Sequence, residues 1–234
     1  MDVIDYLIQF NLTRQEAVIY LALLSEGELN GYETAKITGI SRSNTYNSLA
    51  TLVEKGGSFV IEEAATKYTP VPLEEFCDNK IRKLQKLKQE LIKNVPEKRE
   101  EKGGYITIKG KKHILDKMKN MIGRAKERVY ISASKEVLEE ILEEITEGIK
   151  RDIKVVLITN HSFYLEGAII YHVQESRQQI RLITDSENVM TGDIDDGEYS
   201  TCLYSKKKNL IDLLKESLKN EIKLIEIMKG SGTK

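Results

Sequence analysis

The sequence of 234 residues lacks several features that identify membrane, secreted or metal-binding proteins. No run approaches the roughly 18 uninterrupted apolar residues that span a bilayer. The first residues, Met1 to Asp5, have no basic stretch of the kind that begins a signal peptide, so we expect a cytoplasmic protein. The two cysteines, Cys77 and Cys202, show no metal-ligand spacing with each other or with the three histidines. We therefore expect reduced thiols, and no metal or cofactor.

Residues 30–57 have the pattern of a helix-turn-helix. A short helix is expected from about Tyr32 to Thr38, where Gly39 supplies the left-handed residue that favours a helix end. Ser41 is the expected N-cap of a second helix. The residues of that helix that are spaced to pack on the preceding helices are Thr45, Leu49, Leu52 and Val53.

The opposite face of the second helix is polar and short-chained. Such side chains hydrogen-bond base edges and phosphates when a recognition helix enters the major groove. The candidate DNA-binding residues are Ser41, Arg42, Ser43, Asn44, Asn47 and Ser48. A solvated helix face is the alternative interpretation, although this face is almost free of the Glu and Lys that usually solubilise a helix.

A β-hairpin is predicted directly after the second helix. Phe59 to Ile61 and Lys67 to Thr69 have strand composition, with a short connection between them. A helix-turn-helix followed by two strands is a winged-helix domain, so the first domain is predicted to be an α+β winged helix-turn-helix. Lys67 is then a candidate for contact with a DNA phosphate.

An excess of basic residues, which most DNA-binding modules carry, is missing. Residues 1–72 contain five basic and nine acidic side chains, a difference of −4, and the whole chain has a formal net charge of −1. This balance favours the alternative that the winged helix docks on a protein. Four of the nine acids, Asp2, Asp5, Glu16 and Glu26, lie on the segments before the helix-turn-helix and can face away from DNA. We therefore expect weak, salt-dependent non-specific DNA affinity.

Three segments in this order resemble the N-terminal signature of the TrmB family of transcriptional regulators. They are Phe10 to Leu24, Ile40 to Leu49, and Leu52-Val-Glu-Lys-Gly56. The resemblance covers residues 1–72. Gly57 departs from it, because such domains usually carry an apolar residue there.

Residues 73–102 are predicted to form a helical coiled-coil linker. Leu84, Leu87 and Leu91 are spaced by three and four, and Cys77 lies seven residues before Leu84 on the same seam, with Ile81 beside it. A single charged helix of this length is unstable alone, so we expect it to pair with a second copy and form a homodimer. Packing on its own C-terminal domain is the alternative. A dimer would hold two recognition helices about 34 Å apart, one DNA turn.

Residues 103–234 alternate between strand and helix patterns, which predicts an α/β domain with a largely parallel sheet. The expected helices are residues 111–125, 136–150 and 207–228. The expected strands are residues 105–108, 129–133, 154–159, 168–172, 180–184, 189–194 and 200–204.

This second half is similar to the phospholipase-D-like regulatory domain of TrmB proteins. The similar segments are Ile122 to Ser132, Arg151 to Ile158, and Arg181 to Gly192. Catalytic members of that superfamily carry His-x-Lys-x4-Asp, followed by Gly. With Asp185 and Gly192 on this frame, Gln178 replaces the nucleophilic His and Ile180 replaces the Lys. Neither can act in phosphodiester transfer, so we expect no enzyme activity, and a diverged phosphodiesterase is the competing hypothesis.

A small-molecule effector site is expected beyond the carboxyl ends of the strands, where α/β sheets bind ligands. The candidate effector-binding residues are Ser132, Ser134, Thr159, Asn160 and Asp185. Ordinary turn residues are the alternative interpretation, since Ser, Asn and Asp are common in turns. The TrmB resemblance implies a sugar-like effector and double-stranded DNA as the partner.

Overall fold

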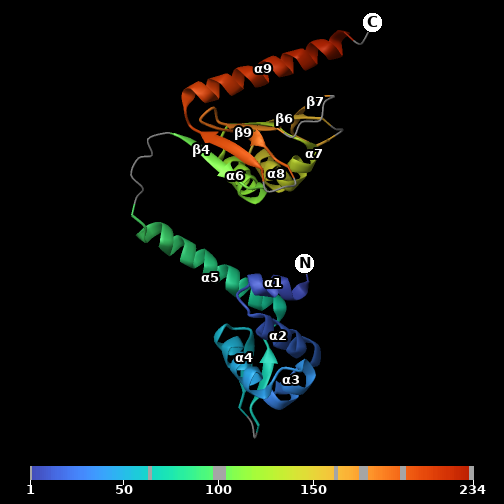
Figure 1. Ribbon diagram of the computed structural model, residues 1–234, viewed down its shortest axis with the longest axis vertical. Coiled ribbons are helices and arrows are strands. Elements are labelled where there is room, and N and C mark those ends of the chain that lie inside the picture. Colours follow the sequence, from blue (N-terminus) through green and yellow to red (C-terminus); the bar gives the residue numbers. More distant parts are fainter. Residues whose placement is uncertain are drawn as a thin grey trace. The chain divides into compact units, whose positions relative to one another are not determined.

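The computed structural model describes residues 2–62, 65–96, 104–160, 163–173, 179–195 and 199–231. The chain divides into two compact units, Met1–Glu97 and Lys98–Lys234 (Figure 1). Within the described ranges, no helix is both long and apolar enough to cross a membrane.

The first unit contains the predicted helix-turn-helix and wing. Its elements are α1 (Val3–Gln9), α2 (Arg14–Glu26), β1 (Leu29–Asn30), α3 (Gly31–Thr38), α4 (Arg42–Glu54), β2 (Ser58–Ile61), β3 (Lys67–Pro70) and α5 (Leu73–Asn94). The strands form an antiparallel sheet in the order β1-β3-β2, of which the short β1 was not predicted. Of the linker predicted for residues 73–102, residues 97–102 lie outside the described residues.

Local signals at α3 explain why the turn forms here. The Asn30 side chain accepts hydrogen bonds from the N–H groups of Tyr32 and Glu33, and thereby starts α3. Gly39 adopts a left-handed conformation with φ of 70° and ends the helix, as predicted. A side chain at this φ would strain the backbone, so the glycine sets the direction in which α4 leaves.

The core of the first unit joins the helix-turn-helix to the base of α5. Tyr20 and Phe76 are fully buried, and their rings lie 5.3 Å apart. The Tyr20 hydroxyl donates a hydrogen bond to the Val71 carbonyl oxygen at 2.7 Å. Leu49 and Leu52 from α4 belong to the same core. The first turn of α5 is therefore part of the winged-helix core.

Gly57 connects α4 to the wing where there is no room for a side chain. A Cβ atom at this position would overlap the fully buried Leu52 side chain. The Gly57 N–H donates to the Leu52 carbonyl, and its own carbonyl accepts from the Val71 N–H. The departure from the family pattern at residue 57 thus allows a close approach of the backbone, and β2 starts at the next residue.

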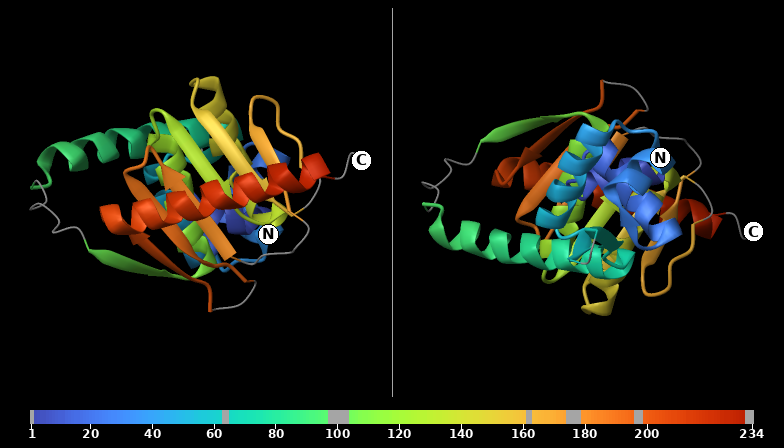
Figure 2. Two further views of the ribbon diagram at one scale, coloured as in Figure 1. Left: turned by 90° about the horizontal axis from the view of Figure 1, so that it is seen from above. Right: turned by 90° about the horizontal axis from the view of Figure 1, so that it is seen from below.

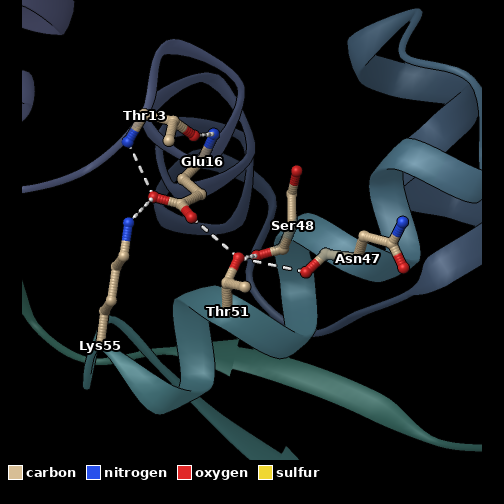
Figure 3. Close-up of polar contacts among 6 residues, drawn as sticks. All are labelled: Thr13, Glu16, Asn47, Ser48, Thr51 and Lys55. Atoms are coloured by element: carbon tan, nitrogen blue, oxygen red, sulfur yellow. Dashed lines mark hydrogen bonds and ion pairs between the residues drawn. The ribbon is translucent and has the colours of Figure 1, made fainter.

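A buried carboxylate, that of Glu16, fastens the end of α4 to the start of α2 (Figure 3). Its oxygens accept hydrogen bonds from the Lys55 ammonium at 2.6 Å, the Thr51 hydroxyl at 2.8 Å and the Thr13 N–H at 2.7 Å. Thr13 in turn accepts from the Glu16 N–H and completes a capping box. Burial alone would raise the pKa of Glu16, but these bonds and the Lys55 charge hold the pKa below the usual 4.5.

The second unit has one large sheet. Its elements are β4 (Tyr105–Lys109), α6 (Lys111–Arg124), β5 (Arg128–Ser132), α7 (Lys135–Glu140), α8 (Leu142–Lys150), β6 (Lys154–Thr159), β7 (Ile169–His172), β8 (Gln179–Thr184), β9 (Asn188–Asp193), β10 (Thr201–Ser205) and α9 (Lys208–Ser231). The single helix predicted for residues 136–150 is divided into α7 and α8, since Ile141 leaves the helical conformation with φ of −119° and ψ of 15°.

The prediction of a largely parallel sheet is wrong. The order is β4-β10-β9-β8-β5-β6-β7, and only the β5–β6 and β6–β7 pairs are parallel. The other four neighbouring pairs are antiparallel. Helices separate β4, β5 and β6 in sequence, whereas the described residues between β8, β9 and β10 include no helix, which permits antiparallel neighbours. Helices α6 to α8 lie on one face of the sheet and α9 crosses the other (Figure 2).

The Glu16 carboxylate makes the stability of the first unit depend on pH. Because its pKa is lower in the folded chain than in the unfolded chain, its contribution is present above about 4.5, the unfolded value, and disappears as pH falls below it. We expect Glu16→Gln to lower the free energy of unfolding by roughly 1–3 kcal/mol at pH 7. Urea denaturation of both proteins should show this difference shrinking near pH 3. A difference that stays constant between these pH values would contradict the assignment.

Candidate nucleic-acid interface

The polar face of α4 is open to solvent, as a DNA-reading face must be. Arg42, Ser43, Asn44 and Asn47 are exposed on α4, and Ser41 is exposed just before it. Thr45, Leu49 and Leu52 are fully buried on the opposite side. The Asn47 side chain points away from the Glu16 carboxylate, and the backbone carbonyl oxygen of Asn47 accepts a hydrogen bond from the Thr51 hydroxyl (Figure 3). The structure therefore places five of the six candidates in this segment at the surface.

The placement of Ser48 on this face is wrong. Its exposed fraction is 8%. Ser48 follows Thr45 by three residues and precedes Leu52 by four, so the helical repeat puts it on the packing side. A small polar residue on the edge of a buried face cannot be distinguished from a ligand-binding one by residue type alone.

The N-terminus of α4 differs from those of α2 and α3. Those helices have capping boxes in which Glu16 and Glu33 occupy the third helical position. In α4, all of which the structure describes, the first turn has no acid and the Ser41 side chain makes no capping hydrogen bond. The N–H groups of the first turn, at the positive end of the helix dipole, are thus available to an anion such as phosphate.

Two tyrosines belong to this surface and were not among the predicted site residues. The Arg42 guanidinium lies 4.7 Å from the centre of the Tyr32 ring, a cation–π contact that orients the arginine. Tyr46, one helical turn after Arg42, is half exposed, and its ring occupies the space that a side chain at Gly31 would need. In the sequence, the four-residue spacing from Arg42 to Tyr46 indicates that these two side chains share one face of the helix.

Lys67, the candidate on the wing, lies on β3 beside β1. Its ammonium is 4.0 Å from the Glu28 carboxylate, and both side chains are more than a third exposed. Such a surface pair contributes little to stability and exchanges readily for another anion.

The candidate effector residues do not all come together. Ser132, Thr159 and Asn160 lie at or just beyond the carboxyl ends of β5 and β6, and Ser134 is the N-cap of α7, accepting from the Val137 N–H. Asp185 follows the last residue of β8 and lies beside the amino end of β5, at the opposite end of the strands from Ser132, because β8 runs antiparallel to β5. The prediction that Asp185 lines the same site is wrong.

Asp185 instead holds a turn together. Its carboxylate accepts hydrogen bonds from the N–H groups of Lys126, Glu127 and Arg128, at 2.9 to 3.0 Å. Burial would raise the pKa of Asp185, but these three bonds outweigh it and hold the pKa below its usual value. Its carboxylate thus has a structural role at the start of β5.

Arg181 is a buried cation at the other end of β5 and was not predicted. Its exposed fraction is 7%, and its guanidinium donates to Glu221 of α9 at 2.6 Å and to Ser132 at 3.0 Å. The sequence signal was an arginine among the apolar residues Ile180, Leu182 and Ile183 of one strand. Thr159 Oγ1, Asn160 Oδ1 and Arg181 Nε are buried without a hydrogen-bond partner among the described residues.

The positions that correspond to the phospholipase frame have structural roles where they are described. Gln178 lies outside the described residues. Ile180 is 1% exposed and belongs to the core between the sheet and α6 to α8. A side chain at Gly192 would overlap the backbone of Thr201 and Cys202 on β10, so the glycine permits close strand packing.

Comparisons with known proteins agree for both halves of the chain. Residues 7–74 match the family described as sugar-specific transcriptional regulator TrmB, and residues 104–219 match the EBD N-terminal subdomain of transcriptional regulator TrmB. The uncharacterized protein YrhO of Bacillus subtilis (strain 168) is 27% identical over 239 residues, which cover 97% of this chain and 87% of YrhO. The sugar-sensing regulator TrmBL1 of Pyrococcus furiosus is 27% identical, over 69% of this chain and 48% of its own length.

Solved structures give weaker matches. TrmBL2, an archaeal chromatin protein, aligns with a TM-score of 0.46 at 18% identity, over 94% of this chain and 97% of its own. The phospholipase D family member Nuc from Salmonella typhimurium aligns with a TM-score of 0.42 at 12% identity, over 51% of this chain and 93% of its own. The two TrmB matches cover the winged helix and most of the second unit in the expected order, and this chain belongs to the TrmB family of transcriptional regulators.

Proposed function

We propose that this protein is a homodimeric, DNA-binding transcriptional regulator that reads its operator with the exposed face of α4. The observation that carries the proposal is that face itself, where Arg42, Ser43, Asn44 and Asn47 are exposed beside an uncapped helix N-terminus. Within α4 the only acid is Glu54, its last residue, so the exposed polar residues in the first half of α4 have no carboxylate among them.

Each part of this surface has a distinct task in the proposal. Arg42, oriented by Tyr32, is suited to a guanine edge, and Asn44 and Asn47 to adenine edges in the major groove. The N–H groups after Ser41 bind a phosphate, and Lys67 on the wing exchanges Glu28 for a phosphate of the DNA backbone.

Dimerisation is proposed to occur along α5. The exposed fractions of its large apolar residues lie between 44% and 65% for Leu84, Leu87 and Leu91 of the seam and Ile81 beside it. Single exposed leucines are common, but four on one stripe of a charged helix indicate a surface that a partner covers. A second α5 provides the same stripe, and Phe76 fixes the base of each helix in its own winged-helix core.

The second unit is proposed to bind an effector, with Ser132, Ser134, Thr159 and Asn160 as contacts. The unpartnered oxygens of Thr159 and Asn160 support this, since buried polar atoms normally have partners. Regulation rather than phosphodiester hydrolysis follows from Ile180, which is a core residue and cannot supply a cation. A ligand changes DNA affinity only through different affinities for two arrangements of the dimer, and α5 connects the two units.

DNA binding of the full chain tests the proposed reading face. We expect specific binding to the DNA upstream of its own reading frame, with affinity falling roughly a hundredfold between about 50 and 200 mM salt if about four phosphates are contacted. Arg42→Ala should weaken binding by about tenfold or more, because a bidentate base contact is lost. Fluorescence anisotropy with labelled duplexes measures both effects.

Arg14→Ala is the matched control for Arg42→Ala. Arg14 begins α2 next to Glu16, which contacts the far end of α4, so its loss should leave DNA affinity unchanged. If both variants lost DNA affinity equally, general electrostatic attraction, and not a reading face on α4, would account for the binding. No binding at either salt concentration would favour a winged helix that docks on protein, as the acidic balance suggests.

Charge substitutions in the α5 seam test the dimer. Leu84→Glu combined with Leu91→Glu places like charges opposite each other, and should convert a dimer to a monomer in sedimentation velocity runs. Gln85→Glu adds an acid one position from the seam and should leave the dimer intact. A wild-type chain that sediments as a monomer, or a double variant that stays dimeric, would contradict the proposal.

A further inference from the structure

Helix α9 covers only part of its face of the large sheet. It packs across β7, β8 and β9, where Leu214 and Leu218 join a core with Ile183 and Val189. Beside α9, a cavity of about 610 Å³ lies over the amino-terminal halves of β5 and β6. The oblique course of α9 over the strands is visible in the left view of Figure 2. This volume falls in the range of small-molecule sites, roughly 300–1,000 Å³.

The floor of this cavity is a continuous apolar surface that includes two aromatic rings. Tyr130 on β5 is the register partner of Val156 on β6, which is the partner of Ile169 on β7. Tyr171 lies two residues after Ile169 on the same face of β7. Half-buried tyrosines and an exposed Ile169 leave apolar area that a flat molecule would remove from water.

Two cations stand at one end of the floor. Arg128 and Lys154 are the first residues of β5 and β6, are register partners, and both line the cavity. Arg128 also lies 3.0 Å from Glu127, but both of these side chains are largely exposed and their pairing is weak. Parallel neighbours in register thus present two positive groups side by side to one ligand.

The wall formed by α9 is also basic. Lys215, Lys219 and Lys223 are spaced by four along the helix and line the cavity. The acids in the lining are Asp212 and Glu216, so five cations face two anions, a balance of +3 in a chain whose net charge is −1. An uncharged sugar would not use this excess of positive charge.

We propose that this groove binds a small organic anion with a flat apolar or aromatic body. The acid group lies between Arg128 and Lys154, and the body rests on Tyr130, Val156 and Ile169. The site is at the amino ends of β5 and β6, the opposite end from Ser132 and Thr159, and it is separate from the effector contacts proposed above. It does not depend on DNA binding by α4.

Anilinonaphthalene sulfonate, a fluorescent aromatic anion, tests the groove on the full chain, and phenyl-naphthylamine is its uncharged counterpart. We expect saturable sulfonate binding at one site per chain. Replacing both Arg128 and Lys154 by Ala should weaken it at least roughly tenfold, because charge-assisted contacts are lost. The double variant Lys109→Ala with Lys112→Ala removes the same charge from the β4 side of the sheet and should bind normally.

A second variant keeps the test valid if the charge variant fails to fold. Ile169→Trp fills the groove at an exposed position without changing charge, and should abolish sulfonate binding while the far-ultraviolet circular dichroism spectrum stays unchanged. Equal affinity for the uncharged amine, or sulfonate binding that survives both sets of substitutions, would overturn the proposal. Absence of saturable binding to the wild-type chain would also overturn it. DNA binding of the same variants reports separately on the α4 surface.

Discussion

The first unit depends on one buried carboxylate with three donors. Glu16 receives hydrogen bonds from the start of its own helix and from two residues at the end of α4, so α2 and α4 are fixed to each other by charge as well as by apolar contact. An unpaired carboxylate in this position would be strongly unfavourable, which makes the arrangement specific. The exposed half of α4 can therefore carry polar residues chosen for a ligand, since the buried half and the Glu16 contacts hold the helix in place.

Much of the winged helix could be predicted because its signals are local. Gly39 and the Thr13–Glu16 capping box act through residues three or four positions away, and the sequence shows them directly. The position of Asp185 could not be predicted in this way, because it depends on the direction of β8 beside β5. The burial of Ser48 was available from the helical repeat that joins it to Thr45 and Leu52, but its residue type alone suggested an exposed position.

The second unit shows the same division between local and distant information. Strand positions follow from apolar runs, yet the sheet is mixed, because no helix separates β8, β9 and β10 in the described part of the chain and such strands can pair antiparallel. Arg181 lies inside the strand β8, and its partners Ser132 and Glu221 come from β5 and α9, far away in the sequence. A buried cation of this kind becomes interpretable only when the elements that surround it are known.

The shared core of the winged helix and α5 has a mechanical consequence. Val71 is hydrogen-bonded to Gly57 and Tyr20, and Phe76 packs on Tyr20 in the core that also holds Leu49 and Leu52, so the base of α5 and α4 are held as one body. With 22 residues, α5 is about 33 Å long, and a tilt of about 10° displaces one end by about 6 Å relative to the other. Successive base pairs are about 3.4 Å apart. For an α4 that lies in the major groove, as proposed above, a small change of angle at the far end of α5 corresponds to a shift of nearly two base pairs, enough to change which sequence spacing α4 fits.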